Sequence, residues 1–271
     1  MTDIGATFRA LHVPGKPFIL ANVWDLGSAK MMASLGAQAL ATSSAAHAFT
    51  LGRPDGGTLS RDDALAHAQD IVAATPLPVQ GDFENGFGDD PETCAETVRM
   101  SAEIGLAGIC IEDIALPTEE AYDFDLAIER IKVAVSAARA LPQDFVLTAR
   151  ADGIMLSAYD IDEAIRRLKA FEAAGADCLY APLPITTADL AKIMDAVTAP
   201  VNVLIDGHYT QLDVATFAKM NVARLSLGST LARVTHQAIY DAAQEMLQHG
   251  GFTRLGNGMS GDHVDALLTQ K

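Results

Sequence analysis

Short apolar runs alternate with longer segments of helical period along most of the chain. Near-continuous apolar runs are typical of parallel strands that are buried on both faces. The eight runs cover residues 18–25, 39–44, 79–84, 108–113, 145–152, 178–184, 201–206 and 224–228. The helical segments between them include residues 61–74, 92–104, 126–140 and 161–174. This alternation of strand and helix predicts an α/β fold, a (β/α)8 barrel of the TIM type.

A faint internal repeat supports the barrel. The segments SLGAQALATSS, EIGLAGICIED, AAGADCLYAPL and KMNVARLSLGS each place a Gly or Asn shortly before an apolar run. Gly and Asn are the residues that end helices in the left-handed conformation, so each segment predicts a helix-to-strand junction. An open, doubly wound sheet is the alternative. It is disfavoured because no G-x-G-x-x-G turn follows the first apolar run.

The two ends of the chain predict additional helices. Residues 3–11 indicate an N-terminal helix that could plug the bottom of the barrel. Residues 229–250 indicate a long helix, and the tail from Gly251 onward is polar and interrupted by glycine. We therefore expect one barrel domain over residues 1–271, with residues 229–271 as a C-terminal helical extension at a subunit interface.

Composition fits one barrel and limits the partners. The 271 residues suit a TIM barrel, which commonly has about 250. The hydrophobic share of 49% excludes a disordered chain. Acidic residues outnumber basic ones by 35 to 19, which gives a formal charge of −16. Such a surface repels phosphate backbones and anionic lipids, so we expect neither nucleic acid nor a membrane as a partner.

Targeting signals are weak. The N-terminal segment MTDIGATFRALHVPG does not resemble a signal peptide, and the longest uncharged stretch, residues 31–52, contains too many polar residues for a membrane span. Cys94, Cys110 and Cys178 lack the spacing of a metal site. They suit small buried side chains in a reducing compartment, so we expect a cytoplasmic protein.

Carboxylates gather where neighbouring apolar runs end. Reactive groups of TIM barrels lie at the C-terminal ends of the strands. Asp82 and Glu84 are two positions apart and would point to one side of a strand, and Glu112 ends the next run. Three carboxylates at one mouth repel each other unless a cation lies among them. Oxygen ligands favour Mg2+, with Mn2+ possible, whereas the lack of His or Cys disfavours zinc. The alternative is that these acids only cap helices.

Other polar residues join them at the predicted mouth. Arg150 is the only cation at these strand ends, and it would either pair with a carboxylate or bind a substrate oxygen. Thr42, Ser43 and Ser44 offer hydroxyl and amide groups that suit a substrate carboxylate or oxyanion. Asp55, in GRPDGG, belongs either to the site or to an ordinary turn.

The motifs TSS, GRPD, GDFENGFG, IED and TAR, in this order, resemble the isocitrate lyase and phosphoenolpyruvate mutase superfamily. The resemblance covers residues 21–229, and GDFENGFG is similar to that family's D-x-D/E-x-G-x-G metal loop. It implies that Asp82 binds Mg2+ directly and that Glu84 and Glu112 hold the ion through water molecules.

The resemblance also implies roles for the other candidates. Asp55 would bond to a metal-bound water or act near the reacting group. Ser43 and Ser44 would cradle the substrate carboxylate, and Arg150 would hold the oxygens on its enolate side. We accordingly regard Asp55 and Arg150 as the catalytic candidates.

One segment departs from the family pattern. Isocitrate and methylisocitrate lyases carry a K-K/R-C-G-H loop after the fourth strand, and its Cys protonates the leaving carbanion. The corresponding segment here, IALPTEEAYDFD, has no Cys, His or Lys. The Lys and Asn of the phosphonate-cleaving members are also missing. The chain therefore resembles a branch of the superfamily without that loop.

The resemblance implies a Mg2+-dependent lyase or hydrolase that acts on a small 2-oxo acid or its 2-hydroxy precursor. Such an enzyme cleaves a C–C bond through a metal-stabilised, enolate-like species. A phosphonopyruvate-type P–C mutase or hydrolase and a non-catalytic 2-oxo acid binding protein stay open as alternatives. We expect a 2-oxo acid carboxylate, not a tricarboxylate, as the small-molecule partner, because Arg150 is the only basic side chain at the strand ends. A homo-oligomer, a dimer of dimers, is also implied.

Overall fold

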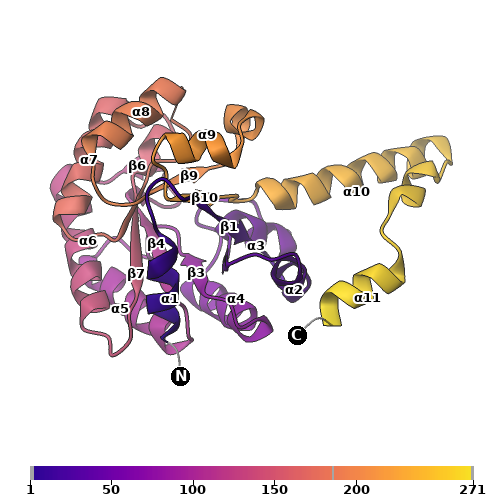
Figure 1. Cartoon of the computed structure of the whole chain (residues 1–271), viewed down its shortest axis with the longest axis horizontal. Helices are drawn as coiled ribbons and strands as arrows, with labels where there is room; N and C mark the ends of the chain where they lie inside the picture. The colour runs from indigo at the N-terminus through magenta and orange to yellow at the C-terminus, as the bar shows by residue number, and fades with distance from the viewer. Residues whose placement is uncertain (1–2, 185, 270–271) are drawn as a thin grey trace.

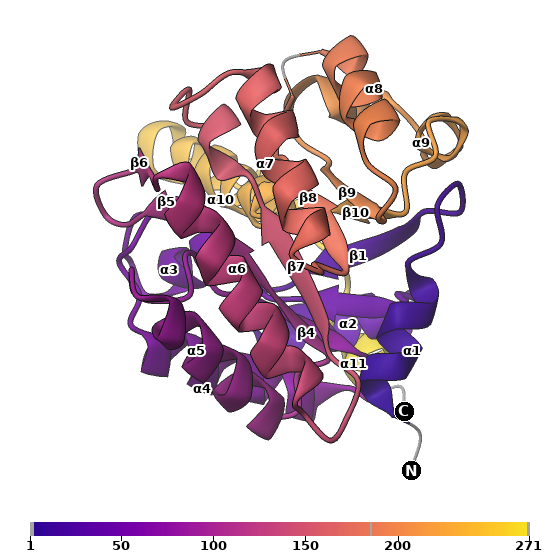
Figure 2. The same cartoon turned by 90° about the vertical axis from the view of Figure 1, so that its left-hand side faces the viewer.

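Eight parallel strands close into a barrel, and helices cover its outside (Figures 1 and 2). The computed structural model describes residues 3–184 and 186–269. The strands follow one another around the barrel in chain order, and β10 pairs with β1 to close it. They are β1 (Phe18–Asn22), β2 (Ala39–Ala41), β3 (Val79–Asp82), β4 (Gly108–Glu112), β7 (Val146–Arg150), β8 (Cys178–Tyr180), β9 (Val201–Leu204) and β10 (Arg224–Ser226). The predicted (β/α)8 barrel is confirmed.

The helices begin where the local sequence supplies a cap. Ser60 accepts a hydrogen bond from the backbone N–H of Asp63 at the start of α4, and Pro91 occupies the first turn of α5 behind the cap Asp90. The helices are α1 (Ile4–Leu11), α2 (Leu26–Ser34), α3 (Ser44–Thr50), α4 (Arg61–Ala74), α5 (Pro91–Glu103), α6 (Phe124–Arg139), α7 (Ile161–Ala173), α8 (Thr187–Ala196), α9 (Val214–Lys219), α10 (Thr230–His249) and α11 (Gly261–Thr269).

The N-terminal helix covers the bottom of the barrel, as predicted. Phe8 of α1 is fully buried against residues at the N-terminal ends of the strands, including Phe18 and Val146. Above it, the barrel interior is polar. The buried guanidinium of Arg224 donates hydrogen bonds to Gln80 (2.7 Å) and Asn202 (2.8 Å). This polar layer separates the plugged bottom from the open mouth.

A short antiparallel hairpin lies at the mouth. It consists of β5 (Ile114–Ala115) and β6 (Glu120–Ala121) and stands between β4 and α6. The apolar pattern does not predict it, because each strand has only two residues. The hairpin occupies the segment IALPTEEAYDFD, and its turn residues Leu116 and Glu119 face the mouth.

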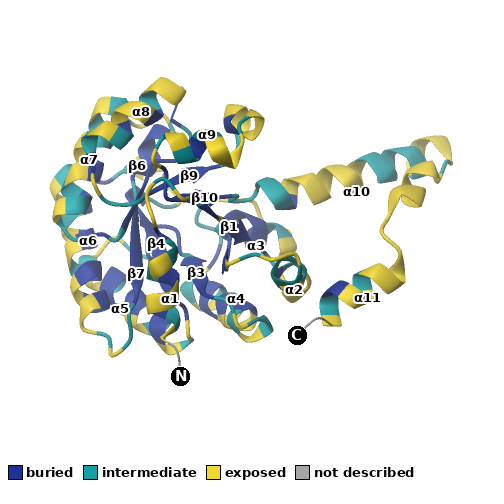
Figure 3. Cartoon of the chain, in the orientation of Figure 1, coloured by how far each residue is buried: buried dark blue, intermediate teal, exposed yellow. Residues whose placement is uncertain are grey.

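The C-terminal helices leave the barrel. Helix α10 extends away from it and α11 turns back towards α2, where Ser34 donates a hydrogen bond to the carbonyl of Leu267 (Figure 1). Ala232 is the one buried residue of α10, and both helices are mostly exposed (Figure 3). The tail beyond Gly251 thus contains a second helix, α11, within the C-terminal helical extension that the sequence predicts. Among the described residues, no helix is both long and apolar enough to cross a membrane.

Candidate active site

The acids that end β3 and β4 converge on Arg150, which ends β7. The Arg150 Nη1 atom lies 3.4 Å from Glu112 Oε2 and 3.7 Å from Asp82 Oδ1, and its Nε pairs with Asp152. Strand register produces this arrangement, since Glu112 is the direct partner of Arg150 across the β4–β7 ladder. One guanidinium therefore faces three carboxylates at the C-terminal mouth of the barrel.

Glu84 reaches the same place from a turn. Strand β3 ends at Asp82, and Glu84 has a left-handed backbone with φ of 47°. The strand alternation that predicted a shared direction for the two acids therefore does not apply to Glu84. Its Oε1 instead accepts a hydrogen bond of 3.0 Å from the backbone N–H of Gly57, in the loop that precedes α4.

Burial raises the pKa of two of these acids, Glu84 and Glu112. Desolvation raises the pKa of Glu84 to about 7, with further contributions from the charges of Asp82 and Asp55. Desolvation also raises the pKa of Glu112 well above its usual range, although Arg150 acts in the opposite direction. Crowded, buried carboxylates with one shared arginine are a donor set that suits a hard divalent cation.

Within residues 3–184 and 186–269, no group of three or more His, Cys, Asp or Glu side chains is arranged so that it could hold a metal ion by itself. Mg2+ usually keeps several water molecules and takes only one or two carboxylates. The residues at the mouth therefore fit Mg2+ bound partly through water.

A small pocket of about 110 Å³ opens between these groups. Ser44, Asp55, Glu84, Glu112 and Arg150 line it, as the sequence predicted for a shared site. Asp82 lies beside the pocket rather than in its wall. The wall also contains Gly56, Glu119 and Asp152, and the wall residues that sequence reasoning missed are Leu116, Met155 and Leu156.

Only one of the three predicted hydroxyl groups faces the pocket. Ser44 lines it and holds Asp82, whose Oδ2 accepts hydrogen bonds from the Ser44 N–H (2.9 Å) and hydroxyl (3.0 Å). The Thr42 hydroxyl accepts from the Asp82 N–H, and the Ser43 hydroxyl caps α3 at the N–H of Ala46. Thr42 and Ser43 thus shape the site through the protein, and substrate contact by them stays a prediction.

Asp55 stands at the rim of the pocket. It is exposed, and its carboxylate accepts a hydrogen bond of 2.9 Å from the N–H of Gly56 in its own turn. Asp55 therefore fits both of its predicted roles, because it forms an ordinary turn and also lines the pocket.

A buried network holds the Arg150 loop in place. The Asp113 carboxylate accepts hydrogen bonds from Arg167 (2.9 Å), from the hydroxyl of Tyr159 (2.9 Å) and from the N–H of Asp152 (2.8 Å). Asp152 in turn pairs with Arg150. The sequence carries one signal for this network, namely an arginine at position 167 on the apolar face of α7.

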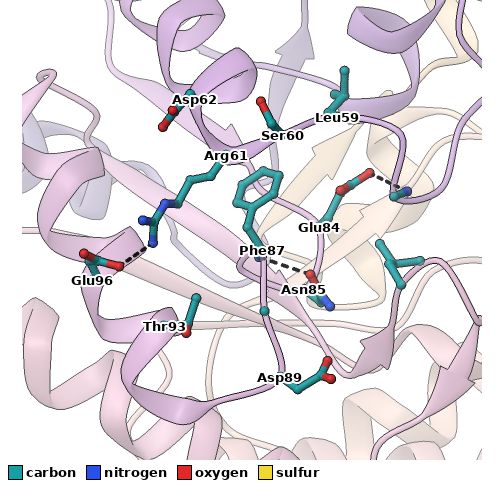
Figure 4. Close-up of a pocket in the computed structure, with 13 residues that line it drawn as sticks. Leu59, Ser60, Arg61, Asp62, Glu84, Asn85, Phe87, Asp89, Thr93 and Glu96 are labelled. Atoms are coloured by element: carbon teal, nitrogen blue, oxygen red, sulfur yellow. Dashed lines mark hydrogen bonds and ion pairs between the residues drawn. The ribbon is translucent and has the colours of Figure 1, made fainter.

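A wider groove of about 640 Å³ lies on the other side of Glu84 (Figure 4). The ring of Phe87 stands in its centre, and Arg61 forms an ion pair of 2.6 Å with Glu96 at one edge. Asp62 and other acids line it as well. Arg61 is the one basic side chain among the residues that line the groove, and it lies at the edge and is more exposed than Arg150.

Tyr122 links the hairpin to the loop that carries Glu84. Its hydroxyl donates to Asp89 (2.6 Å) and accepts from the side-chain amide of Asn85 (2.9 Å). The Arg130 guanidinium lies 4.2 Å from the centre of its ring. The buried hydroxyl of Tyr122 therefore connects the segment after β6 to the loop between β3 and α5.

Tyr122→Phe is expected to lower the free energy of unfolding by about 1–3 kcal/mol, because it leaves the buried amide of Asn85 without an acceptor. Urea unfolding measures the change. The control is Ser136→Ala, which removes an exposed hydroxyl from α6 and should change the free energy of unfolding by no more than about 0.5 kcal/mol. Equal changes in the two variants would contradict the role of the phenol.

Comparison with known proteins identifies relatives along most of the chain. The model of the family described as phosphoenolpyruvate phosphomutase matches residues 8–247. The 2-methylisocitrate lyase of Escherichia coli is 30% identical over 205 residues, which are 73% of this chain and 68% of that enzyme. The oxaloacetate decarboxylase of Paraburkholderia xenovorans is 30% identical over 234 residues, 83% of this chain and 76% of that enzyme.

A solved structure is also similar. The crystal structure of a candidate lyase or mutase from Burkholderia cenocepacia J2315 superposes with a TM-score of 0.93 at 42% identity. The match covers 98% of this chain and 96% of that protein. The similarity therefore includes the helices that follow the barrel.

Proposed function

The chain belongs to the phosphoenolpyruvate phosphomutase family, in the isocitrate lyase and PEP mutase superfamily, and from this premise we propose that it is a Mg2+-dependent lyase or hydrolase. Its substrate is a small 2-oxo acid or the 2-hydroxy acid that yields one, and the reaction breaks a C–C bond. The observation that carries this proposal is the convergence of buried acids and Arg150 around one small pocket.

Each residue at the mouth has a distinct task in this reaction. Asp82 would hold the cation directly, with Glu84 and Glu112 behind water ligands. When bound, the cation supplies positive charge beside the substrate oxygens on which negative charge develops. Arg150, whose Nη1 atom lies 3.7 Å from Asp82, would donate to those oxygens, and its burial makes that contact stronger than it would be in water. Ser44 keeps Asp82 in position.

A substrate panel tests the proposal. The purified protein is incubated with Mg2+ and a set of 2-oxo and 2-hydroxy acids, and released pyruvate is measured with a coupled NADH assay. Turnover of at least one acid, lost with EDTA and restored by Mg2+ or Mn2+, is the expected result. Turnover that EDTA does not change would refute the metal dependence.

The same substrate panel also tests the two alternative functions. Release of inorganic phosphate from phosphonopyruvate would indicate P–C cleavage. Mg2+-dependent binding of 2-oxo acids without turnover would indicate a binding protein, which the missing lid cysteine leaves open. All three cysteines are buried and none lines the pocket, so the proton donor is another group.

We also propose that a second copy of the chain covers an apolar groove on the barrel. Ile19 points outward from β1 and is 46% exposed, which is unusual for a barrel strand. It lies in a groove of about 340 Å³. The other apolar residues of the groove include Phe18, Met32, Leu35 and Val214. Helix α10 projects from its own barrel and carries exposed Ile239, Tyr240 and Leu247, and these apolar side chains suit this groove in a neighbour.

Light scattering is expected to give a multiple of the 28.6 kDa chain mass, most simply a tetramer built from dimers. Ile19→Glu should shift the population towards monomers because it places a charge in the groove. Leu126→Glu, at an exposed position on α6, is the control and should leave the mass unchanged. A wild-type monomer at micromolar concentration would exclude this assembly.

A further inference from the structure

The pocket at the mouth has two chemically different halves. Its inner half is formed by Arg150 and the acids around it. Its outer wall is apolar and comes from two separate segments. Leu116 belongs to the turn of the β5–β6 hairpin, and Met155 and Leu156 follow the short helix η1 (Asp152–Ile154).

These apolar side chains remain partly in contact with water. Met155 is 38% exposed, and Leu116 and Leu156 are half-buried. Three large apolar residues that meet at the rim of an otherwise charged pocket gain stability only when an apolar group covers them. An alkyl group of a ligand would supply that cover.

The charges around the pocket exclude a second ligand carboxylate. Among the described residues that line it, Arg150 is the one basic side chain, and it already pairs with Asp152 and Glu112. The rim adds the acids Asp55 and Glu119. A carboxylate at the outer end of the ligand would therefore meet either apolar carbon or like charge, and both are unfavourable.

The size of the pocket sets a further limit. Its volume of about 110 Å³ corresponds to roughly four water molecules at about 30 Å³ each. This small volume favours a 2-oxo acid head with a short substituent over a long or branched polyacid.

We propose that the substrate carries a short, uncharged aliphatic group opposite its 2-oxo acid, and that Leu116, Met155 and Leu156 recognise this group. The inference rests on the proposed function, which supplies the 2-oxo acid end. It adds the chemistry of the other end and assigns specificity to residues outside the motifs of the family.

A 4-hydroxy-2-oxo acid with an alkyl group at C4 satisfies both halves of the pocket and can be cleaved without a further reactant. A rim carboxylate, Asp55 or Glu119, accepts the proton of the C4 hydroxyl. The C4–O bond becomes the carbonyl of the departing aldehyde, and the electron pair of the C3–C4 bond forms the enolate of pyruvate. Return of one proton to C3 completes pyruvate.

The test compares two ligands that differ only at the outer end, 2-oxopentanoate and 2-oxoglutarate. Calorimetry in the presence of Mg2+ should show 2-oxopentanoate binding at least about tenfold tighter, a difference of about 1.4 kcal/mol. Leu116→Arg and Met155→Arg should each abolish or reverse this preference. Leu126→Arg, outside the pocket, should retain it. The second pocket variant keeps the test valid if the first does not fold.

Equal or tighter binding of 2-oxoglutarate by the wild type would overturn the inference. Binding of pyruvate alone, without either longer acid, would also overturn it while leaving the proposed function intact. If no 2-oxo acid binds, both this inference and the proposed function are refuted. Pyruvate release should likewise be faster from 4-hydroxy-2-oxohexanoate than from 4-hydroxy-2-oxoglutarate, and the reverse order would contradict the assigned reaction class.

Discussion

Asp82→Asn is expected to weaken Mg2+ binding by about 100-fold or more, since the loss of even an outer-shell partner costs 10–100-fold in metal affinity. The substitution removes one negative charge and keeps the shape of the side chain. The asparagine oxygen can still accept the hydrogen bonds from the N–H and hydroxyl of Ser44, so the strand end should stay in place. Calorimetric titration with Mg2+ and with Mn2+ measures the affinity directly and does not depend on knowing the substrate.

A control variant at a second acid distinguishes direct coordination of Mg2+ by Asp82 from the nonspecific attraction of a negatively charged protein. Asp62 lies in the wide groove on the far side of Glu84, and Asp62→Asn makes the same change in net charge (Figure 4). Its Mg2+ affinity should stay within about twofold of the wild type, since exposed charges are strongly screened beyond about 10 Å. Equal losses in both variants, or no loss in Asp82→Asn, would refute the assignment of Asp82 as a ligand.

Substitution of Arg150 is expected to have two separable effects. Arg150→Met leaves the buried Glu112 and Asp152 without their cation, which should lower the free energy of unfolding by about 3–5 kcal/mol. Arg150→Lys keeps the charge and loses the planar fork, so it should weaken Mg2+-dependent pyruvate binding by about tenfold or more while retaining most of the stability. Urea unfolding and calorimetry measure the two effects.

The control for Arg150 is an arginine in an exposed ion pair. Arg99 pairs with Glu92 on the surface of α5, and Arg99→Met should cost at most about 1 kcal/mol. Unchanged pyruvate binding in Arg150→Lys would show that the guanidinium serves the structure alone and does not touch the ligand.

The barrel was predictable because its strands are buried on both faces. Each of the eight apolar runs contains one barrel strand, and α4 has the bounds of its predicted segment, residues 61–74. The predicted runs extend past the strand ends because the polar residues at their ends belong to loops and caps. Ser44, for example, begins α3 instead of ending β2.

The site was predictable only as a set of chemical groups. The sequence places Asp82, Glu112 and Arg150 at strand ends, and the barrel brings strand ends together whatever their separation in the chain. It does not show which way a side chain turns after a strand has ended. The left-handed backbone of Glu84 and the use of the Ser43 hydroxyl as a cap depend on local geometry that alternation cannot predict.

Contacts between residues that are far apart in the sequence could not be predicted for the same reason. Asp113 and Arg167 are 54 positions apart, and neither position alone indicates the other as its partner. The apolar wall combines a leucine from a hairpin of two-residue strands with the turn after η1. No periodic pattern marks such positions, although they decide what the pocket accepts.

The helix that leaves its own barrel has a genetic consequence. If the groove at Ile19 is filled by α10 of a neighbour, each interface takes its helix from one copy and its groove from the other. A chain damaged in the helix, such as Ile239→Glu, and a chain damaged at Ile19 can then share one undamaged interface when they pair. Two alleles that each fail alone would partly rescue one another in the same cell, a case of intragenic complementation.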